Sequence, residues 1–168
     1  TMLKKLIVAL MLIIPMGLCA QQKFGHVNSS AIIPLMPEYT TAQNEIQALQ
    51  KQYEDEIKRM QDELNKKSEE FEAQKATLPA NIAERRQAEL QELFNRMQQY
   101  YQDGEQHMQK ASSEKMGAIS EKLKAAIKEV GVAGGYVYIM DTAAGVPYIS
   151  ETLSTDVTET VKAKLGIK

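Results

Sequence analysis

Few residues of this chain are of the types that carry out catalysis or bind a metal. Its 168 residues contain two histidines, His26 and His107, and a single cysteine, Cys19. Neither histidine has His, Cys, Asp or Glu partners at the spacing of a metal site, and no nucleophile motif is present. The glycine-rich stretch GVAGG, residues 131–135, lacks the strand-then-helix context of a phosphate-binding loop. The sequence therefore predicts no enzyme, no catalytic residue, no metal and no cofactor, and a structural or surface role for both histidines.

The first 20 residues have the pattern of a secretory signal. Two lysines precede an apolar run, residues 6–14, and a proline and small residues follow it. The run is short for a spanning helix, which needs roughly 20 apolar residues. We expect residues 1–20 to be a cleavable signal. Two alternatives stay open: an uncleaved anchor, and a lipid on Cys19, although Leu18 stands where bacterial lipid attachment favours a small residue.

Removal of residues 1–20 would leave a mildly acidic chain. It would have 18 bases, 22 acids and no cysteine. Without cysteine no disulfide can form, and the excess of acids argues against nucleic acid as a partner.

A long polar region, residues 37–130, has the periodicity of helices on both sides of Pro79, the one proline between Pro37 and Pro147. Before the proline, apolar residues recur with an 11-residue period, typical of a nearly straight helix: Ala42, Ile46, Leu49, Tyr53, Ile57, Met60 and Leu64. After it, spacings of four and three alternate, as in a coiled coil: Leu90, Phe94, Met97, Tyr101, Gly104, Met108 and Ala111.

Pro79 indicates a reversal of the chain. Inside a helix a proline costs about 3 kcal/mol or more, whereas at the first turn of a new helix it is well tolerated, and Thr77 could cap that turn. Residues whose numbers sum to roughly 161 are apolar on both sides, which fits an antiparallel pair. We therefore predict a helical hairpin with its tip near residues 77–82 and arms on the order of 60 Å long.

The two ends of the chain predict short strands. Residues 23–33, KFGHVNSSAII, read as a strand and a turn into the first helix. After Gly131, a candidate cap of the long helical region, GGYVYIMD and VPYIS predict a β-hairpin over residues 134–150. DVTETVKAKLG predicts a short helix that is capped by Asp156 or Thr158 and ends at Gly166.

This order of segments resembles the Skp/OmpH family of periplasmic chaperones. The resemblance rests on KFGHVNSSAII leading into MPEYTTAQ, the Gln/Glu/Lys-rich helical hairpin, and then AIKEVGVAGGYVYIMD, VPYIS and DVTETVKAKLG. It implies a mostly helical α+β protein that forms a homotrimer shaped like a jellyfish. Residues 23–36 and 131–168 would build a β-body, from which residues 37–130 would extend as arms.

The resemblance also implies a function. The protein would be an ATP-independent periplasmic holdase that keeps unfolded outer-membrane β-barrel proteins from aggregating in a cavity between its arms. Extra apolar residues of the arms are candidates for binding these clients, and the alternative for each is that it only widens the seam between the two helices: Phe71, Leu78, Ile82, Leu93, Phe94, Tyr100 and Tyr101. Candidates for trimerisation through the body are Phe24, Val27, Tyr136, Tyr138, Ile139 and Tyr148.

The acidity of this chain departs from strongly basic members of the family. The segment from Glu38 to Leu78 contains ten acidic and six basic residues. We therefore do not expect the lipopolysaccharide binding of basic family members here. Peripheral contact with a membrane stays open. Gly104 and Gly117 could let the second arm bend, or could allow close helix packing. The main alternative function is a structural coiled-coil protein that spaces or tethers envelope components without chaperone activity.

Overall fold

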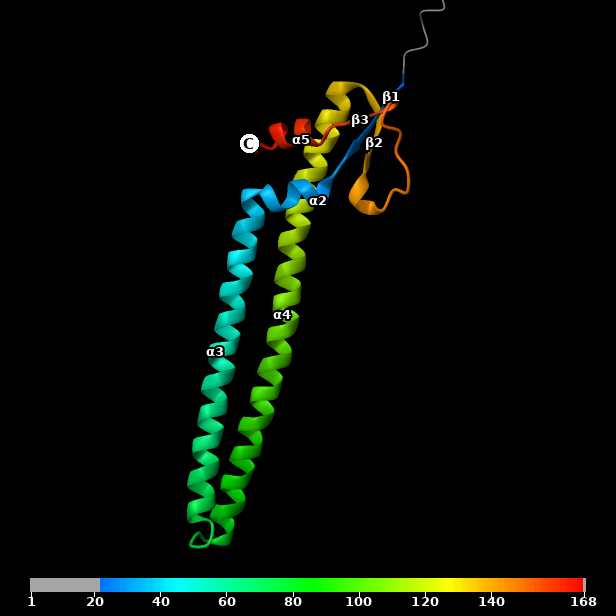
Figure 1. Ribbon diagram of the computed structural model, residues 1–168. Coiled ribbons are helices and arrows are strands. Elements are labelled where there is room, and N and C mark those ends of the chain that lie inside the picture. Colours follow the sequence, from blue (N-terminus) through cyan, green and yellow to red (C-terminus); the bar gives the residue numbers. More distant parts are fainter. Residues whose placement is uncertain (1–21, 168) are drawn as a thin grey trace, which may run out of the picture. The chain divides into compact units, whose positions relative to one another are not determined.

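The computed structural model describes residues 22–167 and has two compact units (Figure 1). The helical unit is Pro34–Glu121, and the sheet unit consists of residues 22–33 and 122–167. Helix α4, Ala80–Gly134, contributes to both. The expected signal, residues 1–20, lies outside the described residues.

Helix α3, Pro37–Gln74, begins with a proline at its first position, where the missing N–H costs no helical hydrogen bond. Its surface is joined by ion pairs between residues three or four positions apart, such as Lys51 with Asp55 at 2.9 Å and Lys67 with Glu63 at 3.1 Å. Such exposed pairs contribute little each. The apolar stripe, with Ala42, Met60 and Phe71 buried, therefore supplies most of the stabilisation of α3.

The predicted break at Pro79 is confirmed. α3 ends at Gln74 and α4 begins at Ala80, and the carbonyl of Pro79 accepts the N–H groups of Ile82 and Ala83, both at 3.0 Å. The predicted cap by Thr77 is wrong, because its hydroxyl donates to the carbonyl of Gln74 at 2.8 Å. Thr77 thus satisfies an acceptor left over at the end of α3 instead of a donor at the start of α4.

Within the helical unit, α3 and α4 lie side by side (Figure 1). Glu45 forms an ion pair with Lys115, and the hydroxyl of Tyr53 lies 2.8 Å from Nδ1 of His107. These contacts join an early part of α3 to a late part of α4.

The coiled-coil positions predicted for α4 are partly wrong. Phe94 and Tyr101 are exposed, whereas Leu93 and Gly104 are buried and Tyr100 is half-buried. The ring of Tyr53 explains the difference, since it lies against the backbone of α4 at Gly104, 5.2 Å from the ring of Tyr100. This contact turns the Leu93 and Tyr100 side of α4 toward α3.

The predicted β-hairpin is also wrong. The sheet has the order β2-β1-β3, and the central strand β1, Lys23–Val27, pairs in parallel with β2, Tyr136–Asp141, and with β3, Ser154–Asp156. After β2, the short 3-10 helix η2, Thr142–Ala144, ends at Gly145 with a left-handed φ of 80°, so the chain does not fold back onto β2. Residues 146–150 form no strand, and their Pro147 lacks the N–H that a sheet ladder needs.

Two boundaries of the helices differ from those predicted. α4 continues through Gly131 to Gly134, and Gly135, with a φ of 67°, takes the left-handed position after the helix end. The last helix, α5, Thr158–Lys164, has Val157 at its N-cap with no side-chain capping bond, although Asp156, one of the two predicted caps, accepts the N–H of Thr158 at 2.9 Å. Its C-cap is Leu165, and Gly166, with a φ of 74°, takes the left-handed position after the helix end, as expected.

The core of the sheet unit is formed by apolar residues from four elements. Val27 of β1 and Ile32 of the short helix α2, Ser29–Ile32, are fully buried, as are Val161 of α5 and, nearly so, Val157. The last turns of α4 add Leu123, Ala126 and Val130. The core thus joins segments from both ends of the chain.

Candidate interaction surfaces

The histidines and acidic residues of the described chain do not form a metal site. No group of three His, Cys, Asp or Glu residues that could hold a metal ion exists within residues 22–167. Of the two histidines, His107 contacts Tyr53, and Nδ1 of His26 lies 2.9 Å from the hydroxyl of Ser154. The candidate functional sites are therefore surfaces that could bind another protein.

The exposed side of α4 carries two large aromatic residues. Phe94 is 39% exposed and Tyr101 is 53% exposed. They are seven positions apart, so they lie on the same side of the helix. The phenol of Tyr101 is hydrogen-bonded to Glu105, and this bond, followed by the charge of Glu105, raises the pKa of the phenol. An aromatic pair on a polar helix is available for contact with another chain.

The other predicted client-binding residues lie in different environments. Phe71 and Leu93 are buried, with 5% and 7% of their surface exposed. Tyr100 is half-buried against Tyr53, and desolvation raises the pKa of its phenol. Near the turn between the helices, Leu78 and Ile82 are half-buried. The structure therefore separates the aromatic pair on the surface from residues that pack between α3 and α4.

A hollow of about 300 Å³ lies between α3 and α4 within the helical unit. Ala42, Ile46 and Met116 give it apolar walls, and Lys115 and Ser112 give it polar ones. The sequence indicated the apolar members through the stripes. It did not indicate Lys115 or Ser112, because their place depends on how the two helices pair.

One face of the sheet is apolar and exposed. Tyr148 is 79% exposed and Leu153 is 74% exposed, and Tyr138 and Met140 of β2 are about half exposed. Together with Phe24 and His26 of β1 they surround a hollow of about 260 Å³. We call this the apolar face; its residues are Phe24, His26, Tyr138, Met140, Tyr148 and Leu153.

The remaining predicted body residues are on the inner side of the sheet unit. Val27 is fully buried, and Tyr136 and Ile139 both lie close to Gly25. Simple alternation along β2 would place Tyr136 on the side of Tyr138, and the structure does not. The register of β1 with β2 shifts between Lys23 and Phe24, so that Val137 bulges and Tyr136 changes sides.

Both outer edges of the sheet lack a strand partner among the described residues. β2 and β3 each pair with β1 alone, so one side of each presents unpaired backbone N–H and C=O groups. A sheet of three short strands with an exposed apolar face and two open edges is expected to be only marginally stable in an isolated chain.

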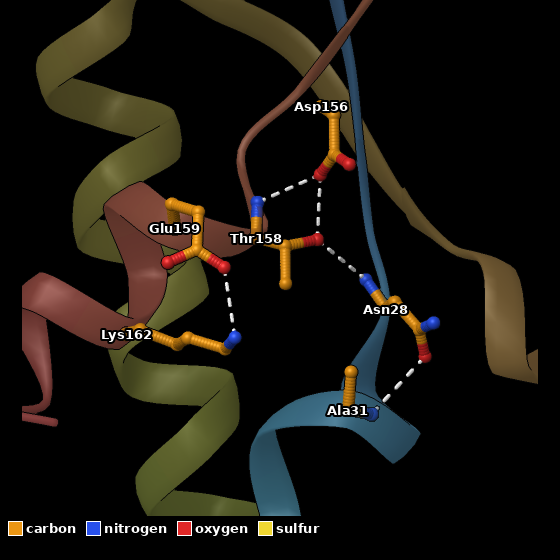
Figure 2. Close-up of polar contacts among 6 residues, drawn as sticks. All are labelled: Asn28, Ala31, Asp156, Thr158, Glu159 and Lys162. Atoms are coloured by element: carbon orange, nitrogen blue, oxygen red, sulfur yellow. Dashed lines mark hydrogen bonds and ion pairs between the residues drawn. The ribbon is translucent and has the colours of Figure 1, made fainter. Parts of the chain in front are cut away.

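A polar network holds β3 and α5 to the start of the chain (Figure 2). The hydroxyl of Thr158 donates to Oδ1 of Asp156 at 2.5 Å and accepts the N–H of Asn28 at 3.0 Å. Asn28 in turn caps α2, since its side chain accepts the N–H of Ala31 at 3.2 Å. The hydrogen bonds from the side chain and then the backbone of Thr158 lower the pKa of Asp156. This network joins β3 and α5 to the residues that follow β1.

Comparison with known proteins identifies the family. The sequence profile of the OmpH-like outer membrane protein family matches residues 23–165. The chain belongs to this family. The match covers β1, both long helices, the sheet and α5, so the resemblance found in the sequence is confirmed, and the family is non-enzymatic.

A solved structure has the same fold as this OmpH-like protein. It comes from Caulobacter crescentus CB15 and is provisionally described as an outer membrane chaperone (OmpH-like). The TM-score is 0.73 at 19% sequence identity, over 87% of this chain and 85% of that one. No curated protein sequence matches the chain significantly. Within residues 22–167, no helix is long and apolar enough to cross a membrane.

Proposed function

We propose that this OmpH-like protein is a periplasmic holdase, which binds unfolded outer-membrane β-barrel proteins without ATP and keeps them from aggregating. Two findings support the proposal: the family match over residues 23–165, and the common fold with a protein provisionally described as an outer membrane chaperone. Residues 1–20 would direct the chain across the inner membrane and then be removed.

We further propose a homotrimer. Residues 23–36 and 131–168 of three copies would form the β-body, with the apolar face covered by neighbouring copies. The exposed Tyr148 and Leu153 and the two open edges of the sheet support this, since all of them gain partners on assembly. α3 and α4 would form an antiparallel arm over residues 37–130, which the contact of Tyr53 with His107 supports.

Phe94 and Tyr101 are our first candidates for client contact. This aromatic pair is the observation that carries the proposal, because an unfolded chain offers apolar side chains and these two are exposed on an otherwise polar helix. Leu78 and Ile82 near the turn would add contacts. Phe71, Leu93 and Tyr100 would reach a client only where α3 and α4 separate.

A light-scattering assay tests the proposal. A urea-unfolded outer-membrane β-barrel protein is diluted into the purified protein without nucleotide, and aggregation is followed against protein concentration. We expect suppression that saturates near one trimer per client. The double variant Phe94→Ser/Tyr101→Ser should need about tenfold more protein for half suppression, as for the loss of two main contact residues.

The control variant is Asn95→Ser/Gln102→Ser, which changes two exposed residues, also one heptad apart, next to the aromatic pair. It should suppress aggregation as the unchanged protein does. Unchanged aggregation in the presence of folded, assembled protein would contradict the proposal and favour the envelope spacer. If both double variants lost the same amount of aggregation suppression, the aromatic pair would not be the client-binding site, and the holdase function would still stand.

A further inference from the structure

The apolar face contains one histidine, His26. Its position follows from β1, where Phe24 and His26 alternate with the buried Gly25 and Val27. His26 is half-buried, and its Nδ1 lies 2.9 Å from the hydroxyl of Ser154 on β3. Histidine is the side chain whose ordinary charge change falls between pH 5 and 8. A proton gained by His26 would therefore place a positive charge within an apolar hollow.

No carboxylate or other cation lines this hollow. The nearest charged groups on the neighbouring elements lie outside it. On β3, Asp156 is the register partner of His26; its Oδ1 accepts the N–H and the hydroxyl of Thr158, and these bonds, followed by the charge of a protonated His26, lower its pKa. On β2, Asp141 accepts the N–H groups of Ser29 and Ala143.

The two remaining charges near the hollow are on β1 itself and on the loop before β3. Nζ of Lys23 donates to the carbonyl of Gly134 at 3.3 Å, and Lys23 lies on the side of β1 opposite to His26. Glu151 belongs to the loop and is exposed. Neither lines the hollow. Neither can therefore compensate for the hydration that a charged imidazole would lose when the apolar face is covered.

We infer that His26 makes the assembly of this OmpH-like protein dependent on pH, because a second copy can cover the apolar face more readily when the imidazole is neutral. The inference rests on the proposed assembly through this face. Nδ1 can keep its contact with Ser154 in either state, since a neutral nitrogen accepts from the hydroxyl and a protonated one donates to it. What changes on protonation is the charge.

The direction of the effect follows from the number of bound protons. If the covered face excludes the proton from His26, the assembled form holds fewer protons than the separate chains. Association then strengthens as the pH rises and weakens as it falls. One linked proton changes the association constant by about tenfold for each pH unit below the region of titration.

The chain provides its own control, because His26 and His107 are its only histidines. His107 lies in the helical unit and contacts Tyr53. The purified protein, His26→Gln, His26→Phe and His107→Gln are compared by sedimentation velocity and mass photometry over a range of concentrations. Measurements are made at pH 5.5 and 7.5 at equal ionic strength, with circular dichroism to check folding.

We expect the unchanged protein and His107→Gln to need at least about tenfold more chain for half assembly at pH 5.5 than at pH 7.5, because each covered face of the proposed trimer would exclude one proton. His26→Phe, which makes the face wholly apolar, should assemble equally well at both values, and His26→Gln should also lose the dependence. If His26→Gln folds poorly, His26→Phe still tests whether the pH dependence needs the imidazole.

Two results would overturn the inference in different ways. Assembly of the unchanged protein that is equally tight at both pH values would overturn the role of His26 and leave the proposed assembly standing. A protein that stays monomeric at every pH and concentration would overturn the proposed assembly itself, and the inference with it.

Discussion

The two units of this chain differ in the sequence separation of the residues that stabilise each of them. In the helical unit most hydrogen bonds and ion pairs join residues three or four positions apart, such as Lys51 with Asp55. In the sheet unit, the N–H of Asn28 reaches the hydroxyl of Thr158, 130 positions away, and the N–H of Ser29 reaches Asp141, 112 positions away. Local interactions form early and at small entropic cost, whereas distant ones must first close a long loop.

This difference separates what each unit is suited to do. The helical unit can tolerate polar surfaces and an exposed aromatic pair because its order depends on short-range contacts. The sheet unit depends on a small core of residues from both chain ends, so single changes there should have large effects. The following variants test the contrast, and all are compared at one protein concentration, because assembly adds to apparent stability.

The largest effect is expected in the core of the sheet unit. Ile32→Ala removes a fully buried side chain and should lower the free energy of unfolding by about 2–5 kcal/mol, from lost burial and the cavity left behind. Urea unfolding measures it. Leu35→Ala is the control, since Leu35 is 51% exposed and its loss should cost far less. Equal losses in both variants would show that the sheet unit has no distinct core.

Two glycines of α4 should respond to alanine with opposite sign. A Cβ on Gly104 would lie 2.7 Å from Cδ1 of Tyr53, so Gly104→Ala should destabilise by about 1–3 kcal/mol. Gly117 has no atom within 4 Å of such a Cβ, so Gly117→Ala should stabilise by about 1 kcal/mol through helix propensity. Thermal unfolding at matched concentration distinguishes them, and stabilisation by both would contradict the close packing of Tyr53.

The sequence predicted the helical unit better than the sheet unit because the interactions of the helical unit are mostly between residues close in sequence. Periodicity and Pro79 indicated both long helices and the break between them. Periodicity did not decide between Phe94 with Tyr101 and Leu93 with Tyr100, because both sets share Met97 and Gly104 as seam positions. Tyr53 of the other helix makes that choice, and no local pattern in α4 contains it.

The sheet unit shows the same limit more strongly. The pattern of residues 136–141 correctly indicates a strand, but it wrongly indicates the next apolar segment, residues 146–150, as the partner of that strand. The true partner is β1, more than 100 positions earlier. The apolar face is therefore only partly predicted. Phe24, Tyr138 and Tyr148 are among the expected body residues, whereas His26 is expected only as a structural or surface residue, and its contact with Ser154, 128 positions away, has no local sequence signal.

Asp156 should make the sheet unit sensitive to acid. Hydrogen bonds from Thr158 lower its pKa below the ordinary value of 3.8, so the carboxylate contributes stability above that value and loses the contribution as the pH falls through the lowered pKa. Asp156→Asn should cost about 1 kcal/mol at pH 7. Urea unfolding should show the gap between variant and unchanged protein closing toward pH 3, and a constant gap would contradict a role for the charge.

The smallest effect is expected from the hydroxyl of Tyr53. Tyr53→Phe removes the hydrogen bond to His107, which is exposed to water, so the free energy of unfolding should fall by about 0.5 kcal/mol. Tyr53→Ala also removes the ring that lies against Gly104, and should cost about 2 kcal/mol. If urea unfolding shows both variants equally destabilised, the hydroxyl and His107 set the pairing of α3 with α4. If only Tyr53→Ala is destabilised, the ring sets it, and α4 turns Leu93 inward and Phe94 outward because a glycine faces that ring.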